Sequence, residues 1–345
     1  MAAGADIARR FFHQAVRGIV EAAAPGVGYV AGRLGTGSDV LGFDDHTSTD
    51  HDFGCRLTVL VDDEYASWIS MVDTALTDRL PDDVDGWPVR FAFSGDEQVV
   101  HRVDIHTVTD FMVARLGFDP RSLDVAQWLC LTGQSVLEAT AGPVFHDSTR
   151  TFAEIRHTLA WYPDAVWLYV VAAGWARLAQ ELPFVGRTGQ VGDDAGSRII
   201  ASRLCRDIAH LTFLAQRAWP PYPKWMGAAL RSLPDGEPCS EQLAAVQAAT
   251  TLNDRQRRLA IAIEALADRQ RRAGITLPAE VMAPFYDRPF VAIHDDVTPT
   301  LRAQITDPAV RDLPPIGSIE QWCDNVDLLS KPARRANLAG IYGVV

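Results

Sequence analysis

The hydrophobic positions of the first 110 residues follow two spacings that alternate along the chain. Residues 5–23 and 64–79 repeat apolar side chains every three or four positions, which is typical of amphipathic helices. The remaining stretches carry β-branched or alternating apolar residues and predict strands over 27–34, 52–61, 89–93 and 99–108. This part of the chain is therefore expected to form a small mixed α/β domain.

Beyond residue 110 the hydrophobic pattern becomes predominantly helical. Apolar stripes predict long helices over 164–181, 194–218 and 253–274, and Asn253 is a suitable N-cap for the last of these. The fold class is therefore α+β. We expect a mixed sheet with flanking helices in residues 1–115, followed by a mainly α-helical domain in residues 116–345.

Composition narrows the class of protein. Hydrophobic residues make up 48% and charged residues 22% of the 345 positions, a balance typical of globular proteins. The net charge of −12 disfavours nucleic acid as a partner, because such binding needs a basic surface. Five scattered cysteines without a CxxC pair, no signal sequence and no 18-residue apolar run predict a cytoplasmic protein that does not enter a membrane.

Two aspartates one residue apart, Asp50 and Asp52, are the strongest chemical signal in the sequence. On an extended strand the side chains alternate between faces, so both carboxylates would lie on the same face. Unpaired, they would repel each other, and a divalent cation between them removes that cost. The spacing therefore predicts a Mg²⁺ site.

Two further features extend this prediction. Asp104 stands between valine and isoleucine in a strand-like stretch, and an acid in that position needs a partner. If its strand lies beside that of Asp50 and Asp52, three carboxylates would bind two Mg²⁺ ions and organise phosphoryl or nucleotidyl transfer. Upstream, Gly37 and Ser38 form a turn whose backbone N–H groups would hold phosphates.

This arrangement resembles the DNA polymerase β-like nucleotidyltransferase superfamily, whose motif is Gly-Ser, a gap of about ten residues, Asp-x-Asp on a strand and a later third acid. Here residues 39 to 49 separate Ser38 from Asp50, and His51 stands where the superfamily usually has an apolar residue. The chain also looks like an uncharacterised bacterial family, known as a domain of unknown function, that is assigned to this superfamily. The stretches that carry this resemblance are Gly37–Gly54, His101–Val108, Trp161–Asp164, Phe184–Arg187, Gly192–Arg198 and Pro221–Trp225.

The resemblance implies a nucleotidyltransferase domain followed by a helical domain that closes the active-site cleft. The expected reaction moves a nucleoside monophosphate, preferably AMP from ATP, to a hydroxyl of a small molecule or protein and releases pyrophosphate. Asp50, Asp52 and Asp104 are expected to be catalytic and to bind the two Mg²⁺ ions. Gly37, Ser38, Arg198 and Lys224 are expected to bind the nucleoside triphosphate.

Several alternatives remain open at this stage. Asp50 and Asp52 would also suit a solvated acidic loop, since Asp44 and Asp45 stand nearby. The chain could keep the fold as a non-catalytic nucleotide-binding or partner-binding protein. A metal-dependent hydrolase would use the histidines His46, His51, His101 and His106, although no HExxH spacing supports it.

The helical domain offers one further polar cluster. Arg203, Asp207 and His210 recur at positions that share one face of a helix. This face would be either a solvated or salt-bridged surface, or a polar wall of the cleft that binds triphosphate or acceptor.

Overall fold

The computed structural model describes residues 4–49 and 53–343, and the contacts within the chain divide it into two compact units. The first unit contains residues 1–123 and 134–160, and the second contains residues 124–133 and 161–345. A mixed sheet lies in the first unit and the second is mainly helical, which confirms the predicted α+β class.

The chain crosses between the units at residues 123/124, 133/134 and 160/161. The sequence pattern placed a single boundary near residue 115, and the contacts instead assign residues 134–160 to the first unit. The reason lies in strand pairing, because β7 (Val144–Asp147) forms an antiparallel pair with β1 (Tyr29–Gly32).

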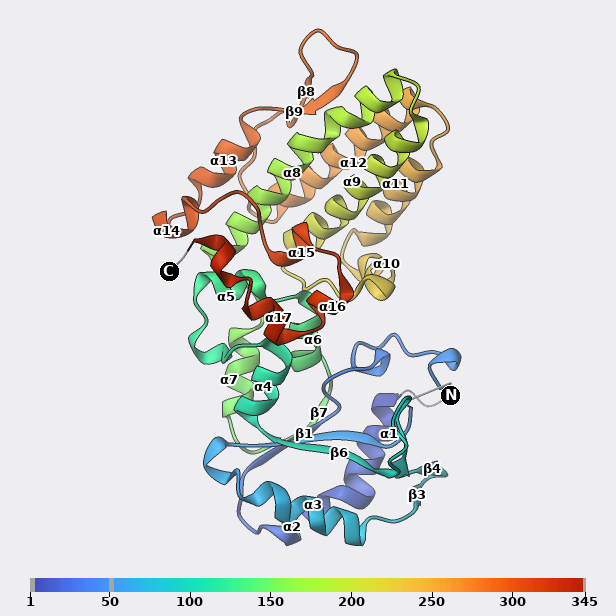
Figure 1. Ribbon diagram of the computed structural model, residues 1–345, viewed down its shortest axis with the longest axis vertical. Helices are drawn as coiled ribbons and strands as arrows, with labels where there is room; N and C mark the ends of the chain where they lie inside the picture. The colour runs from blue at the N-terminus through green and yellow to red at the C-terminus, as the bar shows by residue number, and fades with distance from the viewer. Residues whose placement is uncertain (1–3, 50–52, 344–345) are drawn as a thin grey trace. The chain divides into compact units, whose positions relative to one another are not determined.

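The first unit is built on a five-stranded sheet in the order β5-β6-β2-β1-β7. Three of these strands, β1, β6 and β7, are labelled in Figure 1. β2 and β6 run parallel, and the other neighbouring pairs are antiparallel. The remaining strands of this unit are β2 (Arg56–Val61), β3 (Asp83–Val84), β4 (Trp87–Pro88), β5 (Arg90–Phe91) and β6 (Val100–Thr107).

Helices cover this sheet and complete the core of the unit. Leu57, Val59 and Val61 of β2 are buried in one hydrophobic cluster with helical residues that include Phe11 and Trp68, so the predicted alternation of β2 is confirmed. The helices of this unit are α1 (Gly4–Phe11), α2 (Arg17–Ala23), α3 (Trp68–Arg79), α4 (Val108–Leu116), α6 (Gly133–Thr140) and α7 (Thr151–Thr158), together with short 3-10 turns at Ser38–Val40, His46–Thr49, Asp63–Tyr65 and Pro120–Ser122.

The first helix contains a π-helical turn that the sequence pattern did not predict. Residues Phe12–Val16 join α1 to α2 in this conformation. A π turn adds one residue to the helical repeat. After this turn Val16 and Val20 are fully buried, and Ala15 and Ile19 are partly buried against the same hydrophobic cluster.

β2 also begins later than expected. The strand starts at Arg56 rather than at residue 52, and Gly54 has a φ of 147°, which only glycine adopts readily. The chain therefore bends just before the strand.

The second unit is a bundle of long helices in which α8 (Asp164–Gln190), α9 (Asp194–Ala215), α11 (Gly236–Ala248) and α12 (Leu252–Arg272) pack side by side (Figure 1). α8 extends past the predicted end at residue 181 and contains Pro183. The N-cap of α12 is Thr251, whose hydroxyl accepts from the N–H of Asp254, so the assignment of Asn253 was wrong.

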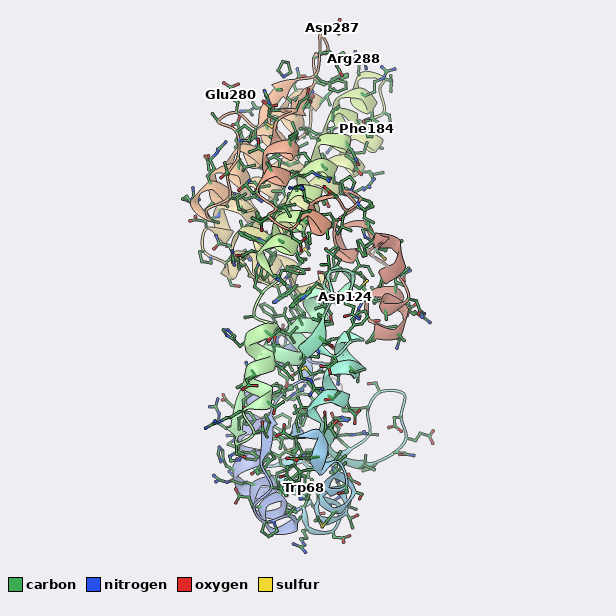
Figure 2. The ribbon with its side chains drawn as sticks, turned by 90° about the vertical axis from the view of Figure 1, so that its left-hand side faces the viewer. Trp68, Asp124, Phe184, Glu280, Asp287 and Arg288 are labelled. Atoms are coloured by element: carbon green, nitrogen blue, oxygen red, sulfur yellow. The ribbon has the colours of Figure 1, made fainter. Side chains whose placement is uncertain are left out.

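Shorter elements surround this bundle. The hairpin of β8 (Met282–Pro284) and β9 (Val291–Ile293) carries Asp287 and Arg288 between its strands (Figure 2). The other helices are α5 (Val125–Cys130), α10 (Pro223–Ser232), α13 (Val297–Ala303), α14 (Pro308–Arg311), α15 (Ile319–Trp322), α16 (Val326–Leu329), α17 (Pro332–Ala336) and the 3-10 turn Ala339–Tyr342. Across residues 4–49 and 53–343, no helix has both the length and the apolar character that a membrane crossing requires.

Candidate functional site

A buried arginine organises the glycine turn that follows β1. Arg33 is 2% exposed, and its guanidinium makes a two-point ion pair with the Asp39 carboxylate at 2.7 and 2.8 Å. The same guanidinium donates to the backbone carbonyls of Leu34 and Thr36, each at 2.7 Å. One side chain thus fixes both ends of the segment between residues 34 and 39.

Gly37 occupies a backbone conformation that this arrangement requires. Its φ of 139° lies in the region that favours glycine, and a Cβ there would stand 2.2 Å from Asp39 Oδ1 and 2.4 Å from Arg33 Nη2. The turn therefore closes tightly around the buried ion pair. The role of Gly37 in phosphate binding stays a prediction.

Ser38 begins a loop that folds back on itself. Its hydroxyl lies 3.3 Å from the hydroxyl of Ser48, and its carbonyl accepts from the N–H of Phe43 at 2.9 Å. Asp45 Oδ1 accepts from the N–H groups of Thr47 and Ser48, so Asp45 caps this loop. The loop therefore brings Ser48, two residues before Asp50 in the sequence, against the start of the turn.

The sheet places Asp104 level with the end of β1. Gly32 of β1 is paired with Thr58 of β2, and Thr58 is paired with Asp104 of β6. The Thr58 hydroxyl also donates to the carbonyl of Leu34 at 3.4 Å, where the glycine turn begins. The glycine turn therefore begins at the same level of the sheet as Asp104, the third carboxylate of the predicted triad. Only β2 lies between their two strands.

The other two carboxylates of the triad, Asp50 and Asp52, lie outside the described residues, as does His51. Their assignment as metal ligands therefore stays a prediction. Within the described residues, the side chain of Asp104 is exposed and has neither an ion pair nor a hydrogen bond. It is thus available to an external ligand.

Arginine and aromatic side chains lie next to the turn. Arg56 Nη2 is 3.4 Å from the hydroxyl of Thr36, and its Cζ is 5.0 Å from the centre of the Phe93 ring. Arg102 lies 3.9 Å from the same ring and donates to the carbonyl of Phe91. The candidate site thus combines a carboxylate with a guanidinium that contacts the glycine turn.

The predicted nucleotide-binding residues Arg198 and Lys224 both belong to the second unit. Arg198, in the first turns of α9, pairs with Asp194 at 2.7 Å. Lys224, at the start of α10, is exposed, and its Nζ lies 4.9 Å from the centre of the Trp225 ring. Both cations reach solvent, and their nucleotide-binding roles stay predictions.

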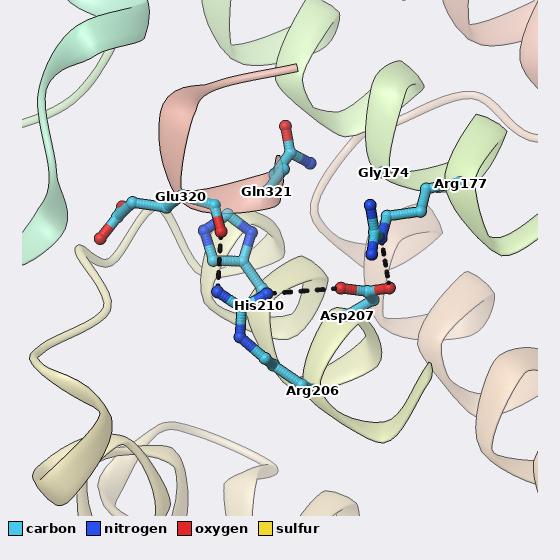
Figure 3. Close-up of a pocket in the computed structure, with 7 residues that line it drawn as sticks. All are labelled: Gly174, Arg177, Arg206, Asp207, His210, Glu320 and Gln321. Atoms are coloured by element: carbon cyan, nitrogen blue, oxygen red, sulfur yellow. Dashed lines mark hydrogen bonds and ion pairs between the residues drawn. The ribbon is translucent and has the colours of Figure 1, made fainter. Parts of the chain in front are cut away.

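Two members of the predicted polar face, Arg203 and Asp207, form salt bridges within the second unit. Figure 3 shows Asp207 beside Arg177, with His210 on the same helix. Arg203 pairs with Glu181 at 2.8 Å, and Asp207 pairs with Arg177 at 2.9 Å. Asp207 and His210 are each only 7% exposed, which excludes a solvated surface at these two positions.

Burial raises the pKa of Asp207 and also shifts the titration of two further groups at this cluster. It lowers the pKa of His210 to about 4, assisted by the positive charge of Arg206, and raises the pKa of Glu320 to about 7. Arg206 donates to the backbone carbonyl of Glu320 at 2.8 Å, while the carboxylate of Glu320 accepts from the N–H of Gly133 at 3.0 Å. The cluster therefore connects α8, α9 and α15 inside one unit.

The histidines do not assemble a described metal site. His101 pairs with Asp73 at 3.3 Å, and the His106 ring lies 6.2 Å from that of Phe111. Within residues 4–49 and 53–343, no group of three or more His, Cys, Asp or Glu side chains could hold a metal ion. Nothing in the described part of the chain favours the metal-dependent hydrolase.

Sequence reasoning missed Arg33, Asp39 and Arg56. An arginine that directly follows the apolar run of β1 was a usable signal, because a buried guanidinium requires a nearby carboxylate. Asp39 was the nearest acid along the chain.

One protein-family model matches a part of the chain. Residues 128–226 match the model of the family "Domain of unknown function (DUF4037)". No curated protein matches the chain. Among solved structures, a nucleotidyltransferase-like protein from Exiguobacterium sibiricum is similar at 16% identity and a TM-score of 0.36, over 76% of this chain and 78% of that chain. A likeness this weak carries no argument about this chain.

Proposed function

We propose that this chain is a Mg²⁺-dependent nucleotidyltransferase that moves AMP from ATP to a hydroxyl acceptor. The observation that supports this most is the pairing of Gly32, Thr58 and Asp104 across three adjacent strands. It sets the glycine turn and an unpaired carboxylate at one level of the sheet. Nucleotidyl transfer needs these two functions, a backbone cradle for phosphates and carboxylates for metal ions, close together.

The donors of the described residues suit a hard cation. Asp104 offers carboxylate oxygens without a competing partner, and Ser38 offers a hydroxyl in the adjoining turn. Asp104, together with Asp50 and Asp52, would hold Mg²⁺, which would neutralise the charge of the triphosphate.

The protein's own groups would carry the remaining steps. The turn at Gly37 and Ser38 would orient the triphosphate through its backbone N–H groups, and Arg56 would add a positive charge beside it. The acceptor oxygen would bond to the α-phosphorus while the bond from that phosphorus to the β-phosphate oxygen breaks. Pyrophosphate would leave, and Asp104 would accept the hydroxyl proton before releasing it to water.

Titration calorimetry of ATP with and without Mg²⁺ tests the proposal. We expect metal-dependent binding by the wild type, and its loss in Asp50→Asn and Asp104→Asn. Asp78→Asn, which changes an exposed acid on α3, is the matched control and should bind as the wild type does. Equal binding by all four proteins without metal would overturn the metal site.

A pyrophosphate-release assay separates this function from a non-catalytic nucleotide-binding protein. The enzyme should release pyrophosphate from ATP in the presence of a hydroxyl acceptor, and Asp104→Asn should lower the rate by at least about a hundredfold. Binding of ATP that never leads to release would favour the non-catalytic alternative.

A further inference from the structure

We propose that the free edge of β6 binds an extended polypeptide segment, and that a hydroxyl side chain of this segment is the acceptor for nucleotidyl transfer. The second half of this inference rests on the proposed function. The first half, peptide binding, stands on the geometry of the sheet alone.

β6 lies near one side of the sheet and is only partly paired there. Its neighbour β5 contacts it at two positions, where Arg90 pairs with His101 and Phe91 pairs with Val100. Among the described residues, no strand pairs with that side of β6 from Arg102 to Thr107. A free edge of six residues is about 20 Å long and presents a row of backbone donors and acceptors.

One hydrogen bond shows which backbone groups face this edge. The N–H of Val103 donates to Nδ1 of His101, on the same strand, at 3.4 Å. Because backbone groups alternate in direction along a strand, the N–H and C=O of Ile105 point to the same side. Another extended backbone supplies groups at the spacing needed to pair with them, which a small molecule does not.

A groove runs along this edge and leaves room for a bound segment. Its volume is about 440 Å³, and it is lined by residues 99–106 together with Asp73 and Thr77 of α3. Val99 and Val100 lie exposed at its beginning, although both are apolar. An extended segment would cover these two side chains.

The charges along the groove favour a basic segment. The guanidinium of Arg90 donates to the carbonyls of Thr77 and Pro81, and that of Arg102 donates to Phe91 and Gln98, so these cations are already engaged. Asp104 has no ionic partner among the described residues, and Asp73 has only His101. Lysine or arginine in the bound segment would complement these two acids.

Pairing at this edge would also position the acceptor. Residues directly opposite each other on paired strands have Cβ atoms about 4.5–5.5 Å apart on the same face of the sheet. A serine or threonine opposite Asp104 would therefore hold its hydroxyl beside that carboxylate. Its oxygen would bond to the α-phosphorus of ATP, pyrophosphate would leave, and the proton would pass to Asp104.

Fluorescence anisotropy without nucleotide or metal tests the binding step. The probe is a fluorescein-labelled peptide of eight residues that alternates valine and serine between terminal lysines. We expect saturable binding, and loss of binding for the same peptide N-methylated at every internal amide, since methylation removes the backbone donors. Val100→Lys should weaken binding by at least about tenfold, because the charge replaces an apolar side chain that the segment would cover and repels the terminal lysines of the peptide.

Val113→Lys is the matched control, because Val113 is a similarly exposed valine (40%, against 44% for Val100) on α4 of the same unit. It should bind the peptide as the wild type does. The inference is overturned if no peptide binds, if the N-methylated peptide binds equally, or if both variants lose binding alike.

The transfer step is tested with ATP labelled at the α-phosphate and Mg²⁺. The serine peptide should acquire label, and its alanine counterpart should not. Binding of the peptide without serine-dependent labelling overturns the acceptor role. Release of pyrophosphate with glycerol as acceptor, when no peptide binds, would leave the proposed function standing and overturn this inference alone.

Discussion

Arg33 and Asp39, six positions apart in the sequence, form a buried ion pair across the glycine turn, with Nε of the arginine 2.7 Å from Oδ2 of the aspartate. Removing one partner of a buried pair leaves an uncompensated charge and costs about 3–5 kcal/mol. Asp39→Ala should therefore lower the free energy of unfolding by that amount in a urea titration.

Asp312→Ala is the control for this measurement, because Asp312 pairs with Arg311 at the surface and is 71% exposed. Its loss should change the free energy of unfolding by less than about 1 kcal/mol. Equal effects of the two substitutions would show that the buried pair does not stabilise the turn.

Gly37→Ala should disturb the same turn from the backbone side. The added Cβ would overlap Asp39 and Arg33, and the φ of 139° is unfavourable for alanine. We expect a loss of at least about 2 kcal/mol in the free energy of unfolding, and weaker binding of ATP. Gly42→Ala is the control, because its φ is also positive at 71° but its Cβ would meet no atom within 4 Å. A loss at residue 42 as large as that at residue 37 would contradict the role of the clash.

Glu320 and His210 should have opposing effects on stability across the acid range. The pKa of Glu320 rises from 4.5 to about 7 on folding, so its contribution to stability is full below pH 4.5 and is lost as the pH rises to about 7. The pKa of His210 falls from 6.5 to about 4, so its contribution is full above pH 6.5 and is lost as the pH falls to about 4. Between pH 4.5 and 6.5 the two slopes, each about 1.4 kcal/mol per pH unit, should largely cancel.

Substituting one of these groups should reveal the slope of the other. Urea titrations of Glu320→Gln should give a free energy of unfolding that rises with pH between 4.5 and 6.5, relative to the wild type. His210→Gln should show the reverse trend. If the free energy of unfolding of both variants depended on pH in the same way as that of the wild type does, the opposing contributions of Glu320 and His210 would be contradicted.

The five cysteine thiols are free, and Cys323 is the most accessible of them. Burial raises the pKa of Cys55 and Cys205 to about 12 and that of Cys130 to about 11, which suppresses their reactive thiolate form. A thiol reagent should therefore modify one residue rapidly in the native protein and all five in urea. Cys323→Ser should abolish the rapid phase, and persistence of that phase would contradict the assignment.

The sequence correctly predicted those helices and strands that a pattern of neighbouring apolar residues identifies. The alternation at Leu57, Val59 and Val61 identified β2, and the apolar stripe of α9 gave a helix that begins at the predicted residue 194. The π turn in the first helix was not predicted, because it shifts the helical repeat without leaving a signature in the apolar pattern.

The candidate site depends on pairings that local patterns do not contain. Asp104 reaches the level of Gly32 only through Thr58, and this register depends on which strands become neighbours. The buried pair of Arg33 and Asp39 depends on the path of the turn between them. Residue types therefore suggested the chemistry, whereas the spatial relationships required the folded chain.

The chain crosses three times between its two units, and these crossings limit where it can be divided into fragments that fold. A fragment that stops at residue 123 would lack β7, so β1 would pair with β2 on one side and have no partner on the other. Such a fragment should aggregate, because an unprotected strand recruits other chains. A soluble form of the first unit must extend to residue 160, and it must carry or replace residues 124–133. The positions at which the chain can be fused to another protein or cut by a protease therefore depend on which strands pair. They do not follow from the order of the elements along the sequence.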